Sequence, residues 1–227
     1  MISLLHSLRR RQLQRSGADR KELLSRTLRR LVRSRSPGAW STLWTDAIYA
    51  WDNARWSAEE QYLAEVVRSA ERAKSLVLEC GSGLTTLLIG AVAARRGLHV
   101  HALEHNPEWQ ARVSSALREF GLVNVTVHLA PLRDFGDFVW YDAPTAVLPT
   151  DFELVVCDGP PEGTRGGRSG VLPVMRRHLA PDCVILLDDA NRPAEQELLA
   201  QWVRDHGAIP QLARSSRGFA RVRLSGA

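Results

Sequence analysis

The stretch Leu76-Val-Leu-Glu-Cys-Gly-Ser-Gly-Leu-Thr-Thr86 decides the fold of this chain. A short apolar run carries an acid near its end, Glu79, and then turns through Gly81 and Gly83 into a segment with helical periodicity. Buried parallel strands deliver their carboxyl ends to ligands in this way. The stretch therefore predicts a strand, a tight turn and a helix arranged around a nucleotide-like cofactor.

Apolar runs alternate with helical segments on both sides of this stretch. A helix is expected from Ser57, as N-cap, to about Ala73, whereas the region between 129 and 153 is expected to be a loop. The remaining strands are predicted at 98–103, 124–129, 153–158 and 183–188, and the remaining helices at 84–95, 107–120, 171–179 and 194–206.

The end of the chain breaks this alternation. Two short runs, 209–214 and 218–224, are joined by Ser215-Ser-Arg-Gly218 and predict an antiparallel hairpin without a helix between its strands. A βα succession gives a mostly parallel sheet with helices on both faces. We therefore expect an α/β, Rossmann-like sheet of seven strands, closed by a C-terminal antiparallel hairpin.

Composition excludes several classes of protein. With 227 residues and 44% hydrophobic content, the chain can bury a full core. Cys80, Cys157 and Cys183 lie at or inside apolar runs and form no CxxC pair, which indicates reduced, buried thiols rather than a disulfide or zinc framework. No apolar run approaches the roughly 20 residues that cross a bilayer. We expect a cytoplasmic protein without a transmembrane segment.

Positive charge is concentrated in the first 36 residues. They carry 11 Lys/Arg and 2 Asp/Glu, a net charge of +9, which leaves −4 for the rest of the chain. Leucines at helical spacing, among them Leu4, Leu5 and Leu8, predict two basic amphipathic helices broken near Ser16-Gly17. The apolar stripe could pack on the domain itself or form a homodimer. Arginines without interleaved aromatics argue against nucleic acid.

A tryptophan-rich connector follows Ser36-Pro37-Gly38. Aromatic residues this close together bury themselves against a neighbouring surface, so we interpret the connector as a cap over the domain. The alternative is that they line a pocket for an acceptor substrate. We therefore divide the chain into a basic helical extension with its cap, residues 1–55, and a main domain, residues 56–227. The connector's tryptophans are Trp40, Trp44, Trp51 and Trp56.

The glycine turn does not identify its ligand by itself. Gly81 and Gly83 bracket Ser82, but Thr86 occupies the place where the dinucleotide fingerprint has its third glycine. A strand-to-helix turn also takes glycine wherever the backbone needs a positive φ.

Glu104 makes the cofactor hypothesis more specific. It ends the second strand about 20 residues past the glycine turn, where an acid can accept both hydroxyls of a ribose. Such an acid could also merely cap the following helix. However, Asn106-Pro107 already supplies a cap and a first-turn proline.

The ordered set of short motifs resembles a bacterial group of class I S-adenosylmethionine-dependent methyltransferases, which is similar to the catechol and macrolide-sugar O-methyltransferases. The resemblance covers about residues 56–224 and leaves out the arginine-rich N-terminus. The motifs are Leu78-Glu-Cys-Gly-Ser-Gly83, Leu103-Glu-His-Asn-Pro-Glu-Trp109, Ala130-Pro-Leu132, Trp140-Tyr-Asp142, Cys157-Asp-Gly-Pro-Pro161 and Leu186-Leu-Asp-Asp-Ala-Asn-Arg192.

The resemblance implies S-adenosylmethionine as cofactor. Glu79 and the Gly81-Ser82-Gly83 turn would hold its amino-acid end, an assignment that suits a free amino and carboxyl group better than a pyrophosphate. Glu104 would bind the ribose with His105 beside it. The adenine would lie against Pro131-Leu132, just after the third strand.

Three acids follow the fourth and fifth predicted strands. Asp158, Asp188 and Asp189 could converge at the carboxyl edge, next to the cofactor's methyl group. Three oxygen ligands with room for water suit Mg²⁺, which could orient an acceptor hydroxyl and lower its pKa. The matching acids of related metal-dependent O-methyltransferases bind such a metal. Alternatively, one carboxylate acts as a general base, or Asp188 or Asp189 only caps the helix near Pro193.

The loop after Asp158 is rich in glycine and arginine. Its composition predicts a mobile lid that brings Arg165 and Arg168 to an anionic group of the acceptor, or else a solvated surface loop. Arg192 is expected either to join them at the substrate or to neutralise the acidic pair. Tyr141, in the Trp-Tyr-Asp motif, is placed with the acceptor as well.

These observations favour O-methylation of a hydroxyl on a small molecule or sugar-containing metabolite, in secondary metabolism. Three alternatives stay open at this point: N-methylation of a small molecule, an NAD-dependent oxidoreductase, and a binding module without catalysis. The missing third glycine and the terminal hairpin argue against the oxidoreductase.

Overall fold

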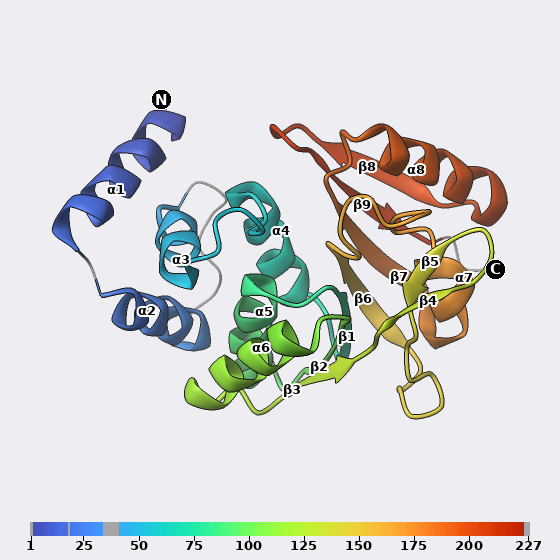
Figure 1. The fold of residues 1–227 in the computed structure, drawn as a ribbon, viewed down its shortest axis with the longest axis horizontal. Coiled ribbons are helices and arrows are strands. Elements are labelled where there is room, and N and C mark those ends of the chain that lie inside the picture. Colours follow the sequence, from blue (N-terminus) through green and yellow to red (C-terminus); the bar gives the residue numbers. More distant parts are fainter. Residues whose placement is uncertain (1, 18, 34–40, 225–227) are drawn as a thin grey trace.

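The computed structural model describes residues 2–17, 19–33 and 41–224 (Figure 1). The predicted end of the extension at Ser36-Pro37-Gly38 and the connector's Trp40 lie outside these residues, as does the side chain of Leu4. A central sheet separates two helical layers in Figure 1, with α4, α5 and α6 on one side and α7 and α8 on the other.

Seven strands form the predicted sheet, in the order β3-β2-β1-β6-β7-β9-β8. The first five strands are parallel, whereas β9 is antiparallel to both β7 and β8. This arrangement confirms the mostly parallel sheet and the C-terminal hairpin. The strands are β1 (Leu76–Cys80), β2 (His99–Glu104), β3 (Val125–Leu129), β6 (Phe152–Cys157), β7 (Leu179–Asp188), β8 (Ile209–Ala213) and β9 (Phe219–Arg223).

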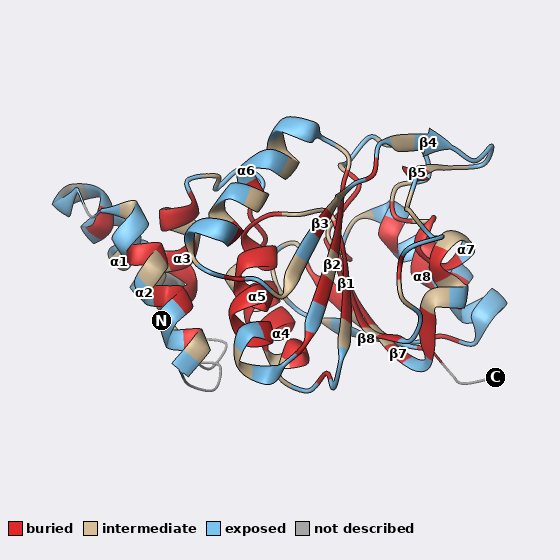
Figure 2. Cartoon of the chain, turned by 90° about the horizontal axis from the view of Figure 1, so that it is seen from below, coloured by how far each residue is buried: buried red, intermediate tan, exposed pale blue. Residues whose placement is uncertain are grey.

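Alternate residues of the strands supply two separate core layers. Within β1, Val77 packs with the helices of one face and Leu78 with those of the other, because successive strand residues point to opposite faces. The first layer contains α4 (Glu60–Ala70), α5 (Leu84–Arg96) and α6 (Pro107–Glu119). The second contains α7 (Val171–Met175) and α8 (Pro193–His206). In Figure 2 helix α5 is mostly buried, whereas α6 is largely exposed.

The strand order reverses beside β1, which pairs with β2 on one side and with β6 on the other. At this point the backbone N–H groups of Asp158 and Gly159 both donate to the carbonyl oxygen of Cys80, at 3.1 and 2.8 Å. The ends of β1 and β6 are therefore tied together. Ligands of open α/β sheets bind at such a switch point, outside the carboxyl ends of the strands.

The N-terminal extension forms two helices, α1 (Ile2–Ser16) and α2 (Arg20–Arg33), that meet near the predicted break. Gly17 adopts a φ of +58°, which favours glycine. The leucine stripe of α2 is buried in the same core layer as α4 and α5, which confirms that it packs on the chain's own domain. On α1, Leu5 and Leu8 stay exposed. The buried leucines of α2 are Leu23, Leu24, Leu28 and Leu31.

The connector is a cap that also reaches the pocket described below. Helix α3 (Leu43–Trp51) buries Trp44 completely in the core, as predicted for a cap. Trp51 and Trp56 line the pocket instead, and Trp56 is 62% exposed. The interpretation as a cap is therefore confirmed for Trp44 and Trp51, while a role for Trp51 and Trp56 in binding an acceptor stays a prediction.

Three local predictions were wrong. The helix predicted from Ser57 begins at Glu60, because the Ser57 hydroxyl donates to the backbone of Asn53 at 3.0 Å and Glu59 takes the N-cap position. Strand β7 begins at Leu179 rather than at 183, after a single 3-10 turn. The expected loop between 129 and 153 contains a second sheet, the hairpin of β4 (Leu132–Asp134) and β5 (Val139–Tyr141).

All three cysteines are buried and free, as expected. Among the helices in the described ranges, none combines the length and apolar composition that a membrane crossing requires.

Candidate active site at the carboxyl edge of the sheet

A cavity of about 410 Å³ opens at the switch point between β1 and β6. Its walls come from the connector, the glycine turn, the ends of β2 and β5, and the segments that follow β6 and β7. The lining includes Trp51, Arg55, Trp56, Gly81, Ser82, Gly83, Thr85, Glu104, His105, Trp109, Tyr141, Asp158, Gly159, Arg168, Asp189, Arg192 and Arg217.

Close packing explains the first glycine of the turn. Gly81 has a φ of +89°, and a Cβ there would lie 3.1 Å from the backbone nitrogen of Gly159. A side chain at 81 would therefore force the ends of β1 and β6 apart. Gly83 is extended instead, with a φ of 170°, and a Cβ there would meet open space.

Thr86 takes a definite part in the turn. Its hydroxyl accepts a hydrogen bond from the backbone N–H of Gly83 at 2.8 Å and donates one to Glu79 Oε2 at 2.6 Å. In the sequence, Thr86 is notable only because it stands where the dinucleotide fingerprint has its third glycine. In the structure it connects the strand-ending acid to the glycine turn.

Glu79 lies beneath the turn rather than in the cavity wall. Its side chain is fully buried, and its Oε1 has no hydrogen-bond partner within the described part of the chain. Burial raises the pKa of Glu79 from 4.5 to about 8, although hydrogen bonds from Thr85 and Thr86 oppose the shift. Without a cation nearby, Glu79 is therefore largely protonated at neutral pH.

Glu104 faces the cavity as a stable carboxylate. Ser82 donates two hydrogen bonds to Oε2, and the backbone N–H of Asn106 donates one to Oε1 at 2.9 Å. Burial opposes the charge, but these donors and His105, 3.2 Å away, leave the pKa of Glu104 below its ordinary value. Trp109 closes this side by donating from its indole to the Ser82 carbonyl at 2.8 Å.

Pro131 and Leu132 lie at the start of the β4–β5 hairpin, outside the cavity lining. Trp51 and Trp109, which meet edge to face at 5.9 Å between ring centroids, line it instead. Sequence reasoning assigned no role to Trp109, even though it ends one of the quoted motifs. The sequence does place this tryptophan in the first turn of the helix that follows Glu104, and that position could have indicated a contact with the cofactor site.

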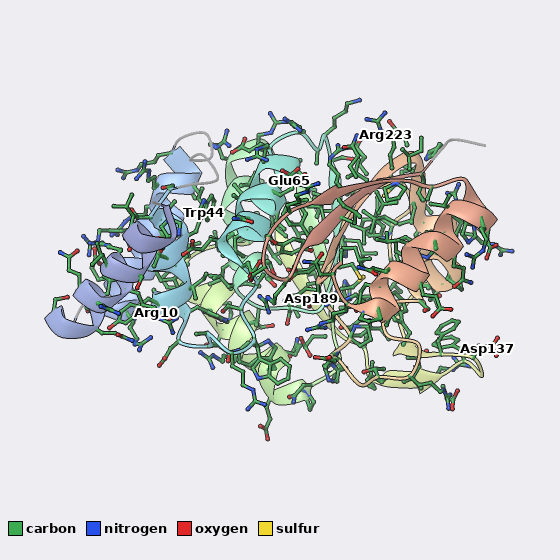
Figure 3. The ribbon with its side chains drawn as sticks, turned by 90° about the horizontal axis from the view of Figure 1, so that it is seen from above. Arg10, Trp44, Glu65, Asp137, Asp189 and Arg223 are labelled. Carbon is green, nitrogen blue, oxygen red and sulfur yellow. The ribbon has the colours of Figure 1, made fainter. Side chains whose placement is uncertain are left out.

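The three predicted acids converge. Asp158, Asp188 and Asp189 each offer an oxygen, and these oxygens lie within 4.8 Å of one another. Asp189 lies near the middle of the molecule (Figure 3) and has a φ of +55°, in the left-handed region that aspartate tolerates better than most residues. Asp158 and Asp189 line the cavity, whereas Asp188 is 1% exposed and lies behind them.

Crowding of carboxylates affects their protonation. Burial raises the pKa of Asp158 above its ordinary value, the charge of Asp189 adds to the effect, and Arg168 opposes it. Burial, together with the charges of Asp158 and Asp189, holds the pKa of Asp188 well above its ordinary range. Among the three acids, Asp158 therefore combines exposure to the cavity with a raised pKa, as a general base requires.

Arg168 lies at the centre of the acidic cluster and is only 3% exposed. The prediction of a mobile lid is therefore wrong for Arg168. Its Nη2 donates to Asp189 Oδ2 at 3.0 Å, to the backbone oxygen of Asp158 at 2.8 Å and to Asp158 Oδ1 at 3.3 Å. Nη1 donates to the backbone oxygen of Asp188.

The other residues predicted at the substrate are spread over different places. Arg192 lines the cavity and pairs with Asp189 at 3.2 Å, so it does neutralise the acidic pair. Arg165 is exposed outside the lining and pairs with Asp134 on the hairpin. Tyr141 is fully buried in the cavity wall, where its hydroxyl lies close to Gly159.

The carboxylates do not match the surroundings that Mg²⁺ requires. This ion binds through one or two carboxylates and keeps several waters. Here the two carboxylates that reach the cavity are both hydrogen-bonded to the Arg168 guanidinium, and the third is sealed behind them. Asn191, a polar residue two positions after Asp189, donates from its side-chain amide to the backbone oxygens of Ser215 and Ser216, so its amide group is engaged with the β8–β9 turn.

A match to a known protein family covers the segment that builds this cavity. Residues 78–190, just under half of the chain, match the model of a family described as a methyltransferase domain. The match runs from β1 to the turn after β7, so it spans the glycine turn, Glu104 and the acidic cluster. No curated protein matches the chain.

Solved structures with the same fold include several methyltransferases. SAH-bound PaMTH1 from Podospora anserina is 16% identical, with 80% of this chain and 86% of that chain covered and a TM-score of 0.62. Cofactor-bound Rv0187 from MTB is 18% identical, with 81% and 88% covered and a TM-score of 0.61. A precorrin-6y C5,15-methyltransferase from Geobacter metallireducens is 18% identical, with 78% and 96% covered and a TM-score of 0.54.

Likenesses at these identities show the fold. The family match adds likeness to a methyltransferase domain over residues 78–190. These comparisons do not separate O-methylation from methylation at other atoms, and they do not single out the group that contains the catechol and macrolide-sugar enzymes.

Proposed function

We propose that this chain transfers the methyl group of S-adenosylmethionine to a hydroxyl of a small molecule or sugar-containing metabolite. The observation that carries the proposal is the placement of Glu104, the glycine turn and Asp158 around one cavity. The first two provide contacts for a nucleoside and an amino acid, and the third provides a base beside the glycine turn.

The cofactor half of the cavity would use groups that the fold already holds in place. Glu104 is ionised and fixed by Ser82, so its carboxylate can accept the ribose hydroxyls. The N-terminus of α5, where Leu84 and Thr85 line the cavity, favours the cofactor's carboxylate. Glu79, directly below, can compensate the ammonium group by ionising, and His105 and Trp109 flank the nucleoside.

Asp158 would perform the proton transfer. The bound cofactor supplies an electrophilic methyl group on a sulfonium. Asp158 accepts the proton of the acceptor hydroxyl as that oxygen forms its bond to the methyl carbon, the carbon–sulfur bond breaks, and S-adenosylhomocysteine and a methyl ether remain. Asp189 and Arg192 complete the wall beside Asp158 and orient the acceptor, with Tyr141 below them.

The contacts of Arg168 favour a base-catalysed reaction over the magnesium-assisted version. A carboxylate base contributes typically 10²- to 10⁴-fold to a reaction, which suits a hydroxyl that must lose its proton. Nitrogen acceptors need less activation, so the presence of a carboxylate base in the cavity wall favours oxygen over nitrogen.

Calorimetry with S-adenosylhomocysteine and with NAD tests the cofactor assignment directly. We expect binding of S-adenosylhomocysteine and none of NAD. Binding of NAD alone would contradict the proposal and favour an oxidoreductase. Methyl transfer from labelled cofactor to matched pairs of alcohols and amines then separates O- from N-methylation, and no transfer to any acceptor would favour a binding module.

A further inference from the structure

We propose that Arg168 is the resident cation of the acidic cluster, in the place where a metal-dependent enzyme would hold its divalent ion, and that it positions Asp158 for proton transfer. The positioning role rests on the proposed function. The guanidinium occupies the cluster and thereby excludes a metal, and this part of the proposal does not depend on the proposed function.

The contacts of Arg168 resemble a small coordination shell. Its two terminal nitrogens reach the backbone oxygens of Asp158 and Asp188 and side-chain oxygens of Asp158 and Asp189. A fourth acid, Glu195 at the start of α8, lies 3.6 Å from Nη1. The planar guanidinium thus connects the ends of β6 and β7 with α8, and it binds one side-chain oxygen of Asp158 and one of Asp189, two of the three acids that could hold a metal ion.

Charge balance explains why this cation is held so firmly. Asp188, Asp189 and Glu195 are each less than 10% exposed, and buried carboxylates are costly unless they are paired. Arg192 and Arg217 approach Asp189 from the cavity, at 3.2 and 3.6 Å. Arg168 is therefore the buried cation that reaches the carboxylates of Asp158, Asp189 and Glu195, and its removal leaves these charges without it.

The backbone around Arg168 is packed against the β4–β5 hairpin. The carbonyl of Arg165 accepts a hydrogen bond from Val139 at 2.8 Å. A Cβ at Gly166 would lie 2.5 Å from Phe138 Cβ, and one at Gly170 would lie 2.2 Å from Trp140 Cγ. These contacts on both sides of Arg168 fix the segment, so the guanidinium does not leave the cluster by a simple loop movement.

This arrangement has a consequence for Asp158. Arg168 donates to Asp158 Oδ1, so the guanidinium fixes one oxygen of the carboxylate that lines the cavity. A single base needs only one hydroxyl, whereas a metal ion gains from two adjacent oxygens. The acceptor therefore does not need a vicinal diol.

Titration with Mn²⁺, followed by electron paramagnetic resonance, tests the exclusion of a metal. We expect wild-type protein to bind no Mn²⁺ up to about 1 mM, and folded Arg168→Met to bind it at the vacated cluster. Arg165→Met, on the same segment but exposed, should behave like wild type. Wild-type binding that Asp158→Asn abolishes would overturn the proposal, as would a folded Arg168→Met that binds no metal.

The wild-type titration decides the matter even if Arg168→Met does not fold. For the positioning role, Arg168→Lys keeps the charge but loses the planar fork. We expect its kcat to fall at least tenfold, its Kd for S-adenosylhomocysteine to change less than threefold, and the acidic limb of its pH profile to move upward. If Arg168→Lys lowers the folded fraction but leaves the acidic limb of the pH profile where it is in wild type, Arg168 has only a structural role. Lost cofactor binding in wild type would instead refute the proposed function while leaving the Mn²⁺ result interpretable.

Discussion

Ser82 donates two hydrogen bonds to the same oxygen of Glu104, one from its backbone N–H at 3.1 Å and one from its hydroxyl at 2.8 Å. The glycine turn after β1 and the acid at the end of β2 are therefore one unit. The turn holds the carboxylate in its charged form, and the carboxylate holds the turn in shape. A cofactor that contacts either residue meets a site that is already assembled.

Replacing Glu104 with Gln should weaken binding of S-adenosylhomocysteine by about 10- to 100-fold, because hydrogen bonds to a charged group contribute roughly 1.5–3 kcal/mol. Isothermal titration calorimetry measures the change. Glu108→Gln provides a matched control, since Glu108 lies one turn away, exposed and outside the cavity. Equal losses in both variants would show that Glu104 has no specific contact with the cofactor.

Glu79 should make the protein without cofactor less stable as the pH rises. Its pKa is raised in the folded state to about 8, so between pH 5 and 8 the folded protein binds a proton that the unfolded chain has released. Stability attributable to this group is complete below pH 4 and falls by up to about 1.4 kcal/mol per pH unit as the pH rises toward 8.

Urea denaturation at several pH values, compared between wild type and Glu79→Gln, measures this contribution. The difference in free energy of unfolding should change steadily between pH 5 and 8 and then level off. A constant difference over this range would mean that Glu79 is already ionised in the folded protein.

Asp158→Asn should lower kcat by about 10²- to 10⁴-fold and leave the Kd for S-adenosylhomocysteine within about threefold. Because the pKa of Asp158 is raised, wild-type activity should fall as the pH drops through a value above the ordinary aspartate range, and this acidic limb should be absent from the variant. Asp142→Asn, an exposed change at the end of β5, serves as the control. A retained acidic limb in Asp158→Asn would assign the base to another group.

Leu31→Ala should destabilise the whole protein by about 2–5 kcal/mol, because this residue of the N-terminal extension is fully buried in the main core. Leu8 on α1 is 51% exposed, so Leu8→Ala should change the free energy of unfolding by less than about 0.5 kcal/mol. Urea unfolding followed by tryptophan fluorescence compares them. Two separate transitions would instead support residues 1–55 as an independent unit.

The sheet could be predicted from the sequence because each long strand is an apolar run between helical segments, and the terminal hairpin has a recognisable turn. The β4–β5 hairpin was missed because its strands have only three residues each, too few to show a period of two. Ser57 was misassigned because a hydroxyl has alternative backbone partners, and the connector offered one four residues earlier.

The acids of the site could be predicted because strand ends of a parallel sheet meet at one edge. The cation that balances them was harder to identify. Arg192 was considered because it follows the acids in sequence, whereas Arg168 reaches them from a segment 20 residues before Asp188 that folds back across the sheet. Glycine content in that segment indicated mobility, yet two of its glycines are required by close contacts with Phe138 and Trp140.

Helix α5 connects the cavity with the N-terminal extension. Its first turn lines the cavity, and near its last turn Arg95 donates a hydrogen bond to the backbone oxygen of Leu31 in α2. Thermodynamic linkage makes any coupling along this helix reciprocal: a partner that rearranges the extension changes cofactor affinity by the same factor by which the cofactor changes affinity for that partner. Hydrogen exchange in α2 with and without S-adenosylhomocysteine would measure any such coupling.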